Sequence, residues 1–187
     1  MEIFNSKILL FGEYGIVAGG TGLAMPYNAY KGQLLKASVP VQKNSEKIQA
    51  SQASLAALGQ YIKNLEQTSL VFNTVAFEKD LRQGLFFDSD IPQGFGLGSS
   101  GALIAAIFHR YIKKRPDKTA QLKPAALALL KAQFAQIENY FHGHSSGVDP
   151  LICYLDTALL MQSKTSLHYA TLPKAKTTGQ YVLFLYN

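Results

Sequence analysis

The spacing of apolar side chains predicts several helices along this chain. The clearest pattern is a stripe over about 124–141, where apolar residues recur three and four positions apart, as on one face of a helix. This stripe comprises Leu127, Leu130, Phe134, Ile137 and Phe141. Weaker patterns of the same kind predict helices over about 50–64, 74–82 and 100–114, and a short helix that ends near residue 155.

Short apolar runs between glycine-rich or polar segments predict strands. These runs lie at about 8–11, 31–39, 85–91, 158–163, 167–170 and 181–186. The chain therefore mixes strands and helices, although the pattern alone does not set the strand order. An apolar strand normally returns into more structure, so the run at 181–186 leads us to expect that the chain has been cut short.

The composition indicates a globular domain. With 187 residues, 48% of them hydrophobic and 16% charged, the chain can bury one sizeable core. No apolar run approaches the roughly 20 residues of a membrane span, and we see no secretory signal. Cys153 is the only cysteine, so no internal disulfide can form. A reducing compartment fits, and we expect a cytoplasmic protein.

The formal net charge of +6 does not by itself indicate a nucleic-acid partner. Such proteins gather Lys and Arg on one face, whereas the lysines here are scattered. The densest group, Lys113, Lys114 and Arg115, is interpreted as the charged end of a helix. A basic balance also suits a protein that handles anionic nucleotides.

The sharpest motif is the glycine-rich segment 92–101, which lies between a predicted strand and a predicted helix. Glycines allow backbone amides to approach a ligand, and a helix N-terminus attracts anions, so the segment could cradle phosphate. The hydroxyls of Ser99 and Ser100 could bind phosphate or magnesium. No Gly-Lys-Ser/Thr follows, so this is not a Walker A loop. The plainer alternative is a glycine-rich turn capped by serine.

A second motif runs from Glu138 to Asp149. A glutamate in the last turn of a helix opposes the helix dipole, and a magnesium ion would offset that cost. Asp149 could serve as a general base for a hydroxyl. Alternatively, Asp149 caps a helix and Glu138 is a solvated surface residue. His142 and His144 are too weak a pattern to indicate zinc.

The third candidate is Lys7, at the head of an apolar strand. A lysine in this position is commonly a surface residue at the end of a strand. It could instead lie beside a carboxylate and stabilise the charge of a transferring phosphoryl group.

In this order, the three segments resemble the GHMP kinase superfamily, and most closely its mevalonate kinase branch. Residues 92–101 are similar to the loop Pro-x-x-x-Gly-Leu-Gly-Ser-Ser-Ala. Residues 7–19 are similar to the opening Lys-Val-Ile-Leu-x-Gly-Glu-His-x-x-Val-x-Gly. Residues 138–149 match Glu-x-x-x-His-Gly-x-x-Ser-Gly-x-Asp with the spacing intact.

The resemblance implies an α+β fold of the ribosomal protein S5 domain 2-like type. The GHMP kinase N-terminal ATP-binding domain would then occupy residues 1–187. The chain would end at about the start of a C-terminal ferredoxin-like domain, which is missing or truncated.

The resemblance also implies roles for individual residues. Asp149 would accept the proton of the substrate hydroxyl, Lys7 would orient Asp149, and Ser100 with Glu138 would hold Mg2+. The residues expected to bind ATP are Pro92, Gly94, Gly96, Leu97, Gly98, Ser99, Ser100 and Gly101. Those expected to contact the substrate are Glu13, Tyr14, His142 and Ser146.

The implied function is ATP-dependent phosphorylation of a small-molecule hydroxyl, with mevalonate to 5-phosphomevalonate in isoprenoid precursor synthesis favoured. The implied partners are ATP, Mg2+ and a small-molecule substrate. We expect no nucleic acid and no membrane, and leave a homodimer open. Tyr14 and Gly101 replace the histidine and alanine of mevalonate kinases, as in phosphomevalonate kinases, but Asp149 favours a hydroxyl substrate. A phosphomevalonate or sugar kinase and a non-catalytic nucleotide- or metabolite-binding relative stay open, as does the activity of this chain alone.

Overall fold

The long strand β2 organises the sheet of this protein. The structure is a computed structural model that describes residues 2–12, 20–37, 46–65, 70–118, 120–163 and 166–171. β2 (Gly22–Lys36) pairs with β1 (Ile3–Phe11) along one side. On its other side it pairs with β4 (Leu85–Ser89) and β6 (Leu159–Met161), and β7 (Leu167–Tyr169) pairs with β6. Every one of these pairings is antiparallel.

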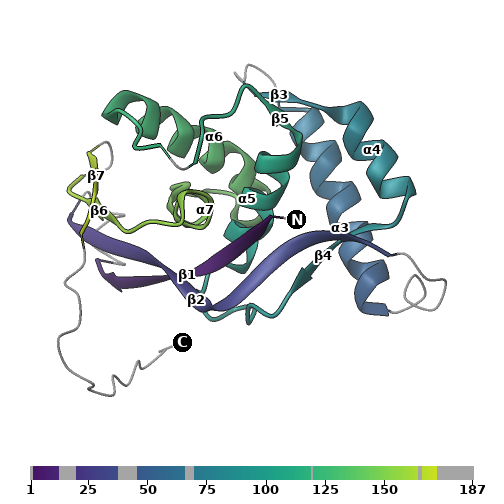
Figure 1. Ribbon diagram of the computed structural model, residues 1–187, viewed down its shortest axis with the longest axis horizontal. Helices are drawn as coiled ribbons and strands as arrows, with labels where there is room; N and C mark the ends of the chain where they lie inside the picture. Colours follow the sequence, from purple (N-terminus) through teal and green to yellow (C-terminus); the bar gives the residue numbers. More distant parts are fainter. Residues whose placement is uncertain are drawn as a thin grey trace.

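The helices lie over one face of this sheet (Figure 1). They are α3 (Glu46–Lys63), α4 (Thr74–Arg82), α5 (Ser99–Tyr111), α6 (Pro124–His142) and α7 (Val148–Leu155). A separate ribbon joins β3 (Val71–Phe72) to β5 (Ile112–Lys113). This arrangement confirms the predicted mixture of strands and helices, and the fold is α+β.

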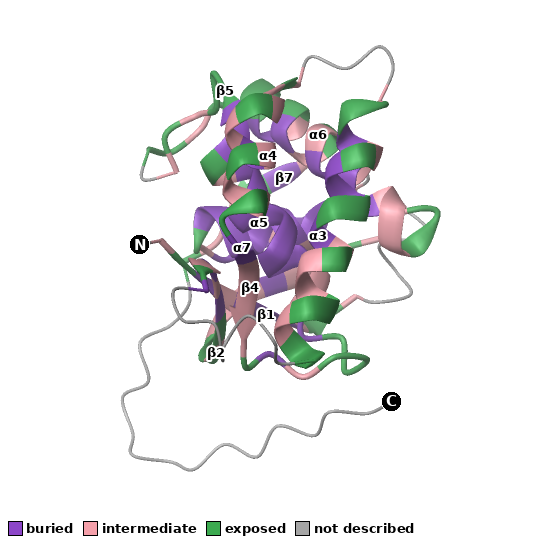
Figure 2. Cartoon of the chain, turned by 90° about the vertical axis from the view of Figure 1, so that its right-hand side faces the viewer, coloured by how far each residue is buried: buried purple, intermediate pink, exposed green. Residues whose placement is uncertain are grey.

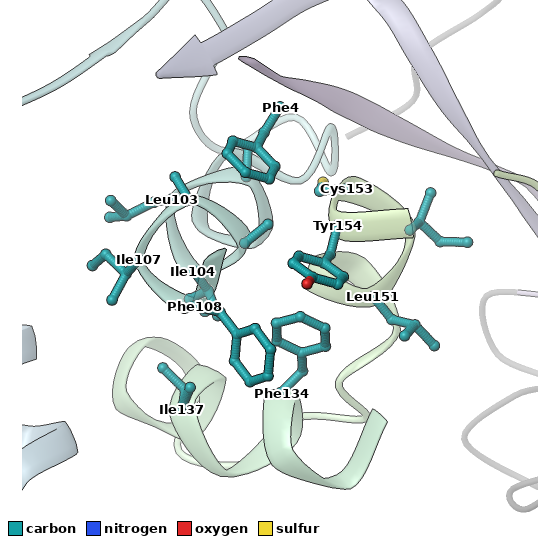
Figure 3. Packing of buried hydrophobic residues seen from close by; sticks show 14 of the residues in the cluster. Phe4, Leu103, Ile104, Ile107, Phe108, Phe134, Ile137, Leu151, Cys153 and Tyr154 are labelled. Atoms are coloured by element: carbon teal, nitrogen blue, oxygen red, sulfur yellow. The ribbon is translucent and has the colours of Figure 1, made fainter. Parts of the chain in front are cut away.

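The aromatic core joins three of the helices. Phe108 of α5, Phe134 of α6 and Tyr154 of α7 pack ring against ring, with centroids 4.6 to 5.5 Å apart (Figure 3). α5 and α7 are buried over most of their surface (Figure 2), because the sheet lies on one side of them and other helices on the other. The predicted stripe on α6 is buried from Leu127 to Ile137, whereas Phe141 is half-buried.

The carboxylate of Asp80 links the helices α4 and α5 to the strand β2. Asp80 of α4 accepts hydrogen bonds from Arg110 at 2.7 Å and Tyr111 at 2.8 Å, and pairs with Lys36 of β2 at 2.6 Å. Burial alone would raise the pKa of Asp80, but hydrogen bonds from Lys36 and Tyr111 outweigh it and lower the pKa. The cluster therefore stabilises the packing of α4 and α5 on the sheet.

Several boundaries of the predicted elements differ from the structure. β1 and β2 begin earlier than predicted, at Ile3 and Gly22. α5 ends at Tyr111, because Ile112 turns to extended backbone and pairs with Phe72. The interpretation of Lys113, Lys114 and Arg115 as a helix end is therefore wrong. The run at 181–186 lies outside the described residues. Within them, no helix is long and apolar enough to span a bilayer.

Candidate active site

A cleft of about 730 Å³ opens between the glycine-rich segment, the start of α5 and the first half of α3. Seven of the eight residues predicted to bind ATP line it, namely Pro92, Gly94, Gly96, Leu97, Gly98, Ser99 and Ser100. Asp149 and His142 line the same cleft. The fold thus brings together side chains from distant parts of the sequence that the motifs had suggested separately.

The loop takes a backbone shape that favours glycine. Gly94, Gly96 and Gly98 have φ values of 81°, 65° and 77°, in the region that residues with side chains rarely adopt. A Cβ on Gly94 or Gly96 would meet no atom within 4 Å, so the backbone there is open to a ligand.

The same loop leads into an uncapped helix. Gly98 is the N-cap of α5, and no side chain caps the helix, so the alternative of a serine-capped turn is wrong. The first amides of α5 can therefore donate to an anion. Together with the open backbone of the loop, they fit the phosphates of a nucleotide.

Lys7 and Asp149 form an ion pair at the wall of the cleft. The Lys7 Nζ lies 2.9 Å from Asp149 Oδ1, with side chains that are 8% and 35% exposed. Lys7 lies in the middle of β1, so its interpretation as a surface residue at a strand end is wrong. Asp149 lies in the first turn of α7, whose N-cap is Gly147, so the capping interpretation is also wrong. The pair presents a partly exposed carboxylate that a buried cation holds in place.

Glu138 lies beneath this pair. It is 3% exposed and accepts a hydrogen bond from the Ser145 hydroxyl, so the surface interpretation is wrong. Burial raises the pKa of Glu138 from its ordinary 4.5 to about 7, and the negative charge of Asp149 adds to the increase. The hydrogen bond from Ser145 and the positive charge of Lys7 oppose it. Glu138 does not line the cleft, unlike Ser100.

The other predicted site residues take different places. The Ser100 hydroxyl lies 3.2 Å from His142 Nε2 at the edge of the cleft. Ser146 is exposed and accepts a hydrogen bond from the Val148 amide at the start of α7, away from the cleft. Gly101 is buried against α7 and does not line the cleft either. Glu13 and Tyr14 lie outside the described residues.

The described ranges contain no group of three or more His, Cys, Asp and Glu side chains that could hold a metal ion. A magnesium ion needs few protein ligands, because it commonly combines one or two carboxylates with water and substrate phosphates. Ser100 offers a hydroxyl oxygen in the cleft, and Glu138 is a carboxyl that is buried outside the cleft lining, so both are oxygen donors of the kind that magnesium takes.

The helix α3 also contributes to the cleft, which the sequence pattern did not predict. Lys47, Ser51 and Ser54 from its first half line the cleft opposite the loop. The apolar spacing that predicted this helix begins at Leu55, so nothing marked the preceding polar turns as part of a site.

A model of the GHMP kinases N terminal domain matches residues 60–157, just over half of the chain. The chain belongs to the GHMP kinase family. Kinases of this family generally use ATP. No curated protein sequence matches the chain significantly.

Among the solved structures similar to this GHMP kinase chain are three mevalonate kinases. That of Methanococcus jannaschii has 16% identity and a TM-score of 0.50, covering 91% of this chain and 55% of its own. A second mevalonate kinase has 16% identity and a TM-score of 0.47, covering 90% of this chain and 55% of its own. L. major mevalonate kinase in complex with R-mevalonate has 16% identity and a TM-score of 0.43, covering 84% of this chain and 47% of its own.

The chain spans about half the length of these mevalonate kinases. At this identity the likeness establishes the fold, and it confirms the predicted N-terminal half of a GHMP kinase. The extent of the domain over residues 1–187 and the homodimer stay predictions, as do the roles of the individual site residues.

Proposed function

We propose that this chain carries the ATP-binding and phosphoryl-transfer site of a small-molecule kinase, with mevalonate as the favoured substrate. One observation carries the proposal. Asp149, paired with the buried Lys7 at 2.9 Å, lines the same cleft as a glycine-rich loop whose backbone is open to anions. Phosphoryl transfer needs a nucleotide and a hydroxyl positioned together, and this cleft offers a place for both.

In this proposal the glycine-rich loop and the first amides of α5 bind the phosphates of ATP. The nucleoside extends towards α3, where Lys47, Ser51 and Ser54 line the cleft. Mg2+, when bound, would neutralise the phosphate charge, and Ser100 and Glu138 would hold it.

Asp149 acts as the general base. It takes the proton of the substrate hydroxyl as the hydroxyl oxygen bonds to the γ-phosphorus and the bond from that phosphorus to the bridging oxygen of ADP breaks. Lys7 holds the carboxylate in one position and stabilises the negative charge that develops on the transferring group. Because Lys7 is 8% exposed and its amide donates to the Leu97 carbonyl at 3.0 Å, β1 ties this cation to the loop.

The presence of a base favours a hydroxyl substrate. A phosphate nucleophile, as in phosphomevalonate, is already ionised and needs no base. A non-catalytic binding relative needs neither Asp149 nor Lys7. The base therefore supports a hydroxyl substrate, and the resemblance of residues 138–149 to mevalonate kinases favours the conversion of mevalonate to 5-phosphomevalonate, in isoprenoid precursor synthesis, over a sugar. A cytoplasmic location fits a chain with a single, buried cysteine.

The proposal is tested by ADP release from Mg-ATP with mevalonate, phosphomevalonate and several sugars. We expect release that depends on mevalonate, and a loss of about 10²–10⁴-fold in kcat in Asp149→Asn, because a positioned base contributes that much. Asp156→Asn is the matched control. It makes the same chemical change at the other end of α7, where Asp156 accepts a hydrogen bond from Asn5 at 2.9 Å.

The outcomes separate the candidates. Unchanged turnover in Asp149→Asn would refute the assignment of the base. Release that depends on phosphomevalonate or a sugar would change the substrate. Nucleotide binding without ADP release, in a protein as long as the solved mevalonate kinases, would favour the non-catalytic relative.

A further inference from the structure

The helix α3 presents one polar face to the cleft. Lys47, Ser51 and Ser54 are four and three residues apart, so they lie on the same side of the helix. All three line the cleft, opposite the glycine-rich loop. A ligand bound on the loop therefore lies between the loop backbone and this face of α3.

The hydroxyl of Ser51 ties this face of α3 to the sheet. It accepts a hydrogen bond from the Phe87 amide at 2.8 Å and donates one to the Phe87 carbonyl at 3.4 Å. Phe87 belongs to β4, so a strand holds the first half of α3 beside the cleft. The Ser51 hydroxyl is thus used within the fold, and Lys47 lies one turn away from this anchor.

Lys47 is the one lysine or arginine among the described residues that line the cleft. It is exposed, and no ion pair joins it to a carboxylate in the part of the chain that the structure describes. Lys63, in the last turn of the same helix, pairs instead with Glu78 at 3.5 Å. The charge of Lys47 is therefore available to a ligand in the cleft.

The position of Lys47 is unfavourable for the helix itself. Lys47 lies in the first turn of α3, where the helix dipole favours carboxylates and disfavours cations. Lys63, by contrast, lies in the last turn, where the dipole favours a cation. Helix stability therefore gives no reason for a lysine at position 47, whereas an anion bound in the cleft would offset its cost.

The other groups of the cleft compensate a polyanion mainly on the side of the loop. The loop and the first turn of α5 supply amides, which carry partial charges but no formal charge. The carboxylate of Asp149 is negative and already paired with Lys7. The ammonium of Lys47, on its flexible four-carbon stem, supplies a full positive charge on the side of α3.

We propose that Lys47 binds the phosphates of the nucleotide from the α3 side, opposite the amides of the loop. This inference rests on the proposed function, in which the loop binds the phosphates of ATP. It assigns Lys47 to the phosphates and not to the nucleoside, because an ammonium acts as a point charge that a phosphate oxygen satisfies. The cleft then recognises phosphate from two sides.

The test compares binding affinities, measured by calorimetry with ATP, ADP and adenosine as probes. Lys47→Met removes the charge and keeps a long side chain. It should raise the Kd of ATP and ADP by about 5- to 20-fold, between the values for an exposed ion pair and for a buried hydrogen bond to a charged group. The Kd of adenosine, which has no phosphate, should change by less than about twofold. Lys47→Arg, which keeps the charge, should bind ATP within about threefold of the wild type.

Lys63→Met is the matched control. It removes a charge from the same helix, at the end where Lys63 pairs with Glu78 and outside the lining of this cleft. It should leave all three affinities unchanged. Urea unfolding checks the fold of both variants. Lys47→Met should unfold at an equal or higher urea concentration than the wild type, because a cation is removed from the first turn of α3.

Ionic strength gives a second readout. The contact between an exposed ammonium and a phosphate weakens as salt screens it. The Kd of ATP for Lys47→Met divided by that for the wild type should therefore fall towards one between about 50 and 500 mM salt. A ratio above one that does not change with salt would mean that Lys47 contributes packing and not charge, and would overturn the inference.

Turnover separates this inference from the proposed function. Lys47→Met should raise the KM for ATP by about 5- to 20-fold and leave kcat within about twofold, because the contact is equal in the ground state and the transition state. Binding of ATP that depends on Lys47, without ADP release in a protein as long as the solved mevalonate kinases, would refute the kinase and keep the inference. ADP release that Lys47→Met does not affect would keep the kinase and refute the inference.

The binding data alone can also overturn the inference. An equal loss of affinity for adenosine and ATP would assign Lys47 to the nucleoside. An unchanged Kd for ATP would make Lys47 a solvated surface residue. Either result contradicts the proposal, as does a wild-type protein that binds no nucleotide.

Discussion

Glu138 is a buried carboxyl whose charge the folded protein disfavours. Its pKa rises from 4.5 to about 7, so the folded state holds the proton more tightly than the unfolded state does. The stability this provides is fully present below pH 4.5 and is lost as the pH rises to about 7. The difference between the pKa of Glu138 in the folded and unfolded states corresponds to about 3 kcal/mol of unfolding free energy.

Glu138→Gln should therefore stabilise the ligand-free protein by about 2–3 kcal/mol at pH 8 and have little effect at pH 4.5. Glutamine is uncharged, and its carbonyl can still accept from Ser145. Urea unfolding at a series of pH values measures this difference. Glu46→Gln, at the exposed start of α3, is the control and should show no such gain. An equal loss of stability with pH in Glu138→Gln and wild type would contradict the prediction.

At this scale the motifs named residues that the structure brings together, but they did not predict how deeply each one is buried. Local pattern marked Lys7 as a strand residue, but its burial depends on α7 and the 92–101 loop, which are distant in the sequence. Only the resemblance linked it to Asp149. Likewise, nothing in the stripe on α6 shows that Glu138 is buried, because Ser145 and Asp149 come from beyond the helix.

At the scale of elements, the tight turn between α6 and α7 fixes the position of Asp149. Gly147 has a φ of 74°, and a Cβ there would lie 2.2 Å from the Lys131 carbonyl and 2.6 Å from the Ala135 nitrogen. Gly143 has a φ of 66°, but a Cβ would meet nothing within 4 Å. The two glycines therefore share a positive φ, but they differ in ψ, which is −38° at Gly143 and 9° at Gly147, and in the space around a Cβ.

This contrast predicts different costs for the same substitution. Gly143→Ala should lose about 1 kcal/mol of unfolding free energy, from backbone strain alone. Gly147→Ala should lose about 3 kcal/mol or more, because α7 must also move off α6. Urea denaturation of the two variants measures the difference. Equal losses would show that α7 adjusts freely at this turn.

Elements with their own periodicity were predictable, whereas elements defined by pairing were not. The 124–142 helix and the 74–82 helix match the predicted ranges closely, because each carries its own apolar face. The end of α5 was misplaced, since Ile112 leaves the helix to pair with Phe72 some 40 residues earlier. The early start of β2 at Gly22 depends on β1 and β6, which supply its partners.

For the whole molecule, ligand binding and stability are linked. If the cleft binds Mg-ATP, saturation at about 100 times the Kd should stabilise the fold by about 2.7 kcal/mol. For a protein of this size that corresponds to a rise of about 5–10 °C in Tm. Thermal unfolding with Mg-ATP, and with ATP plus a chelator, measures both the effect and its dependence on metal.

Ser100→Ala sharpens this measurement. If Ser100 is a magnesium ligand, its loss should weaken the stabilisation by Mg-ATP and leave the effect of metal-free ATP unchanged. Ser166→Ala is the control, because Ser166 does not line the cleft and its hydroxyl contacts His168 of β7. A Ser100→Ala protein that responds to Mg-ATP like the wild type would remove Ser100 from the metal site.

The buried position of Cys153 allows the opening of the site to be followed by its reaction with a thiol reagent. The thiol is 1% exposed and lies 3.9 Å from the Gly98 carbonyl, and burial raises its pKa, so the closed protein protects it from thiol reagents. No other thiol is present in the chain. The rate at which a thiol reagent labels Cys153 therefore measures how often α7 and the glycine-rich loop separate. The opening of the site can thus be followed at one sulfur atom, without a substrate and without an introduced cysteine.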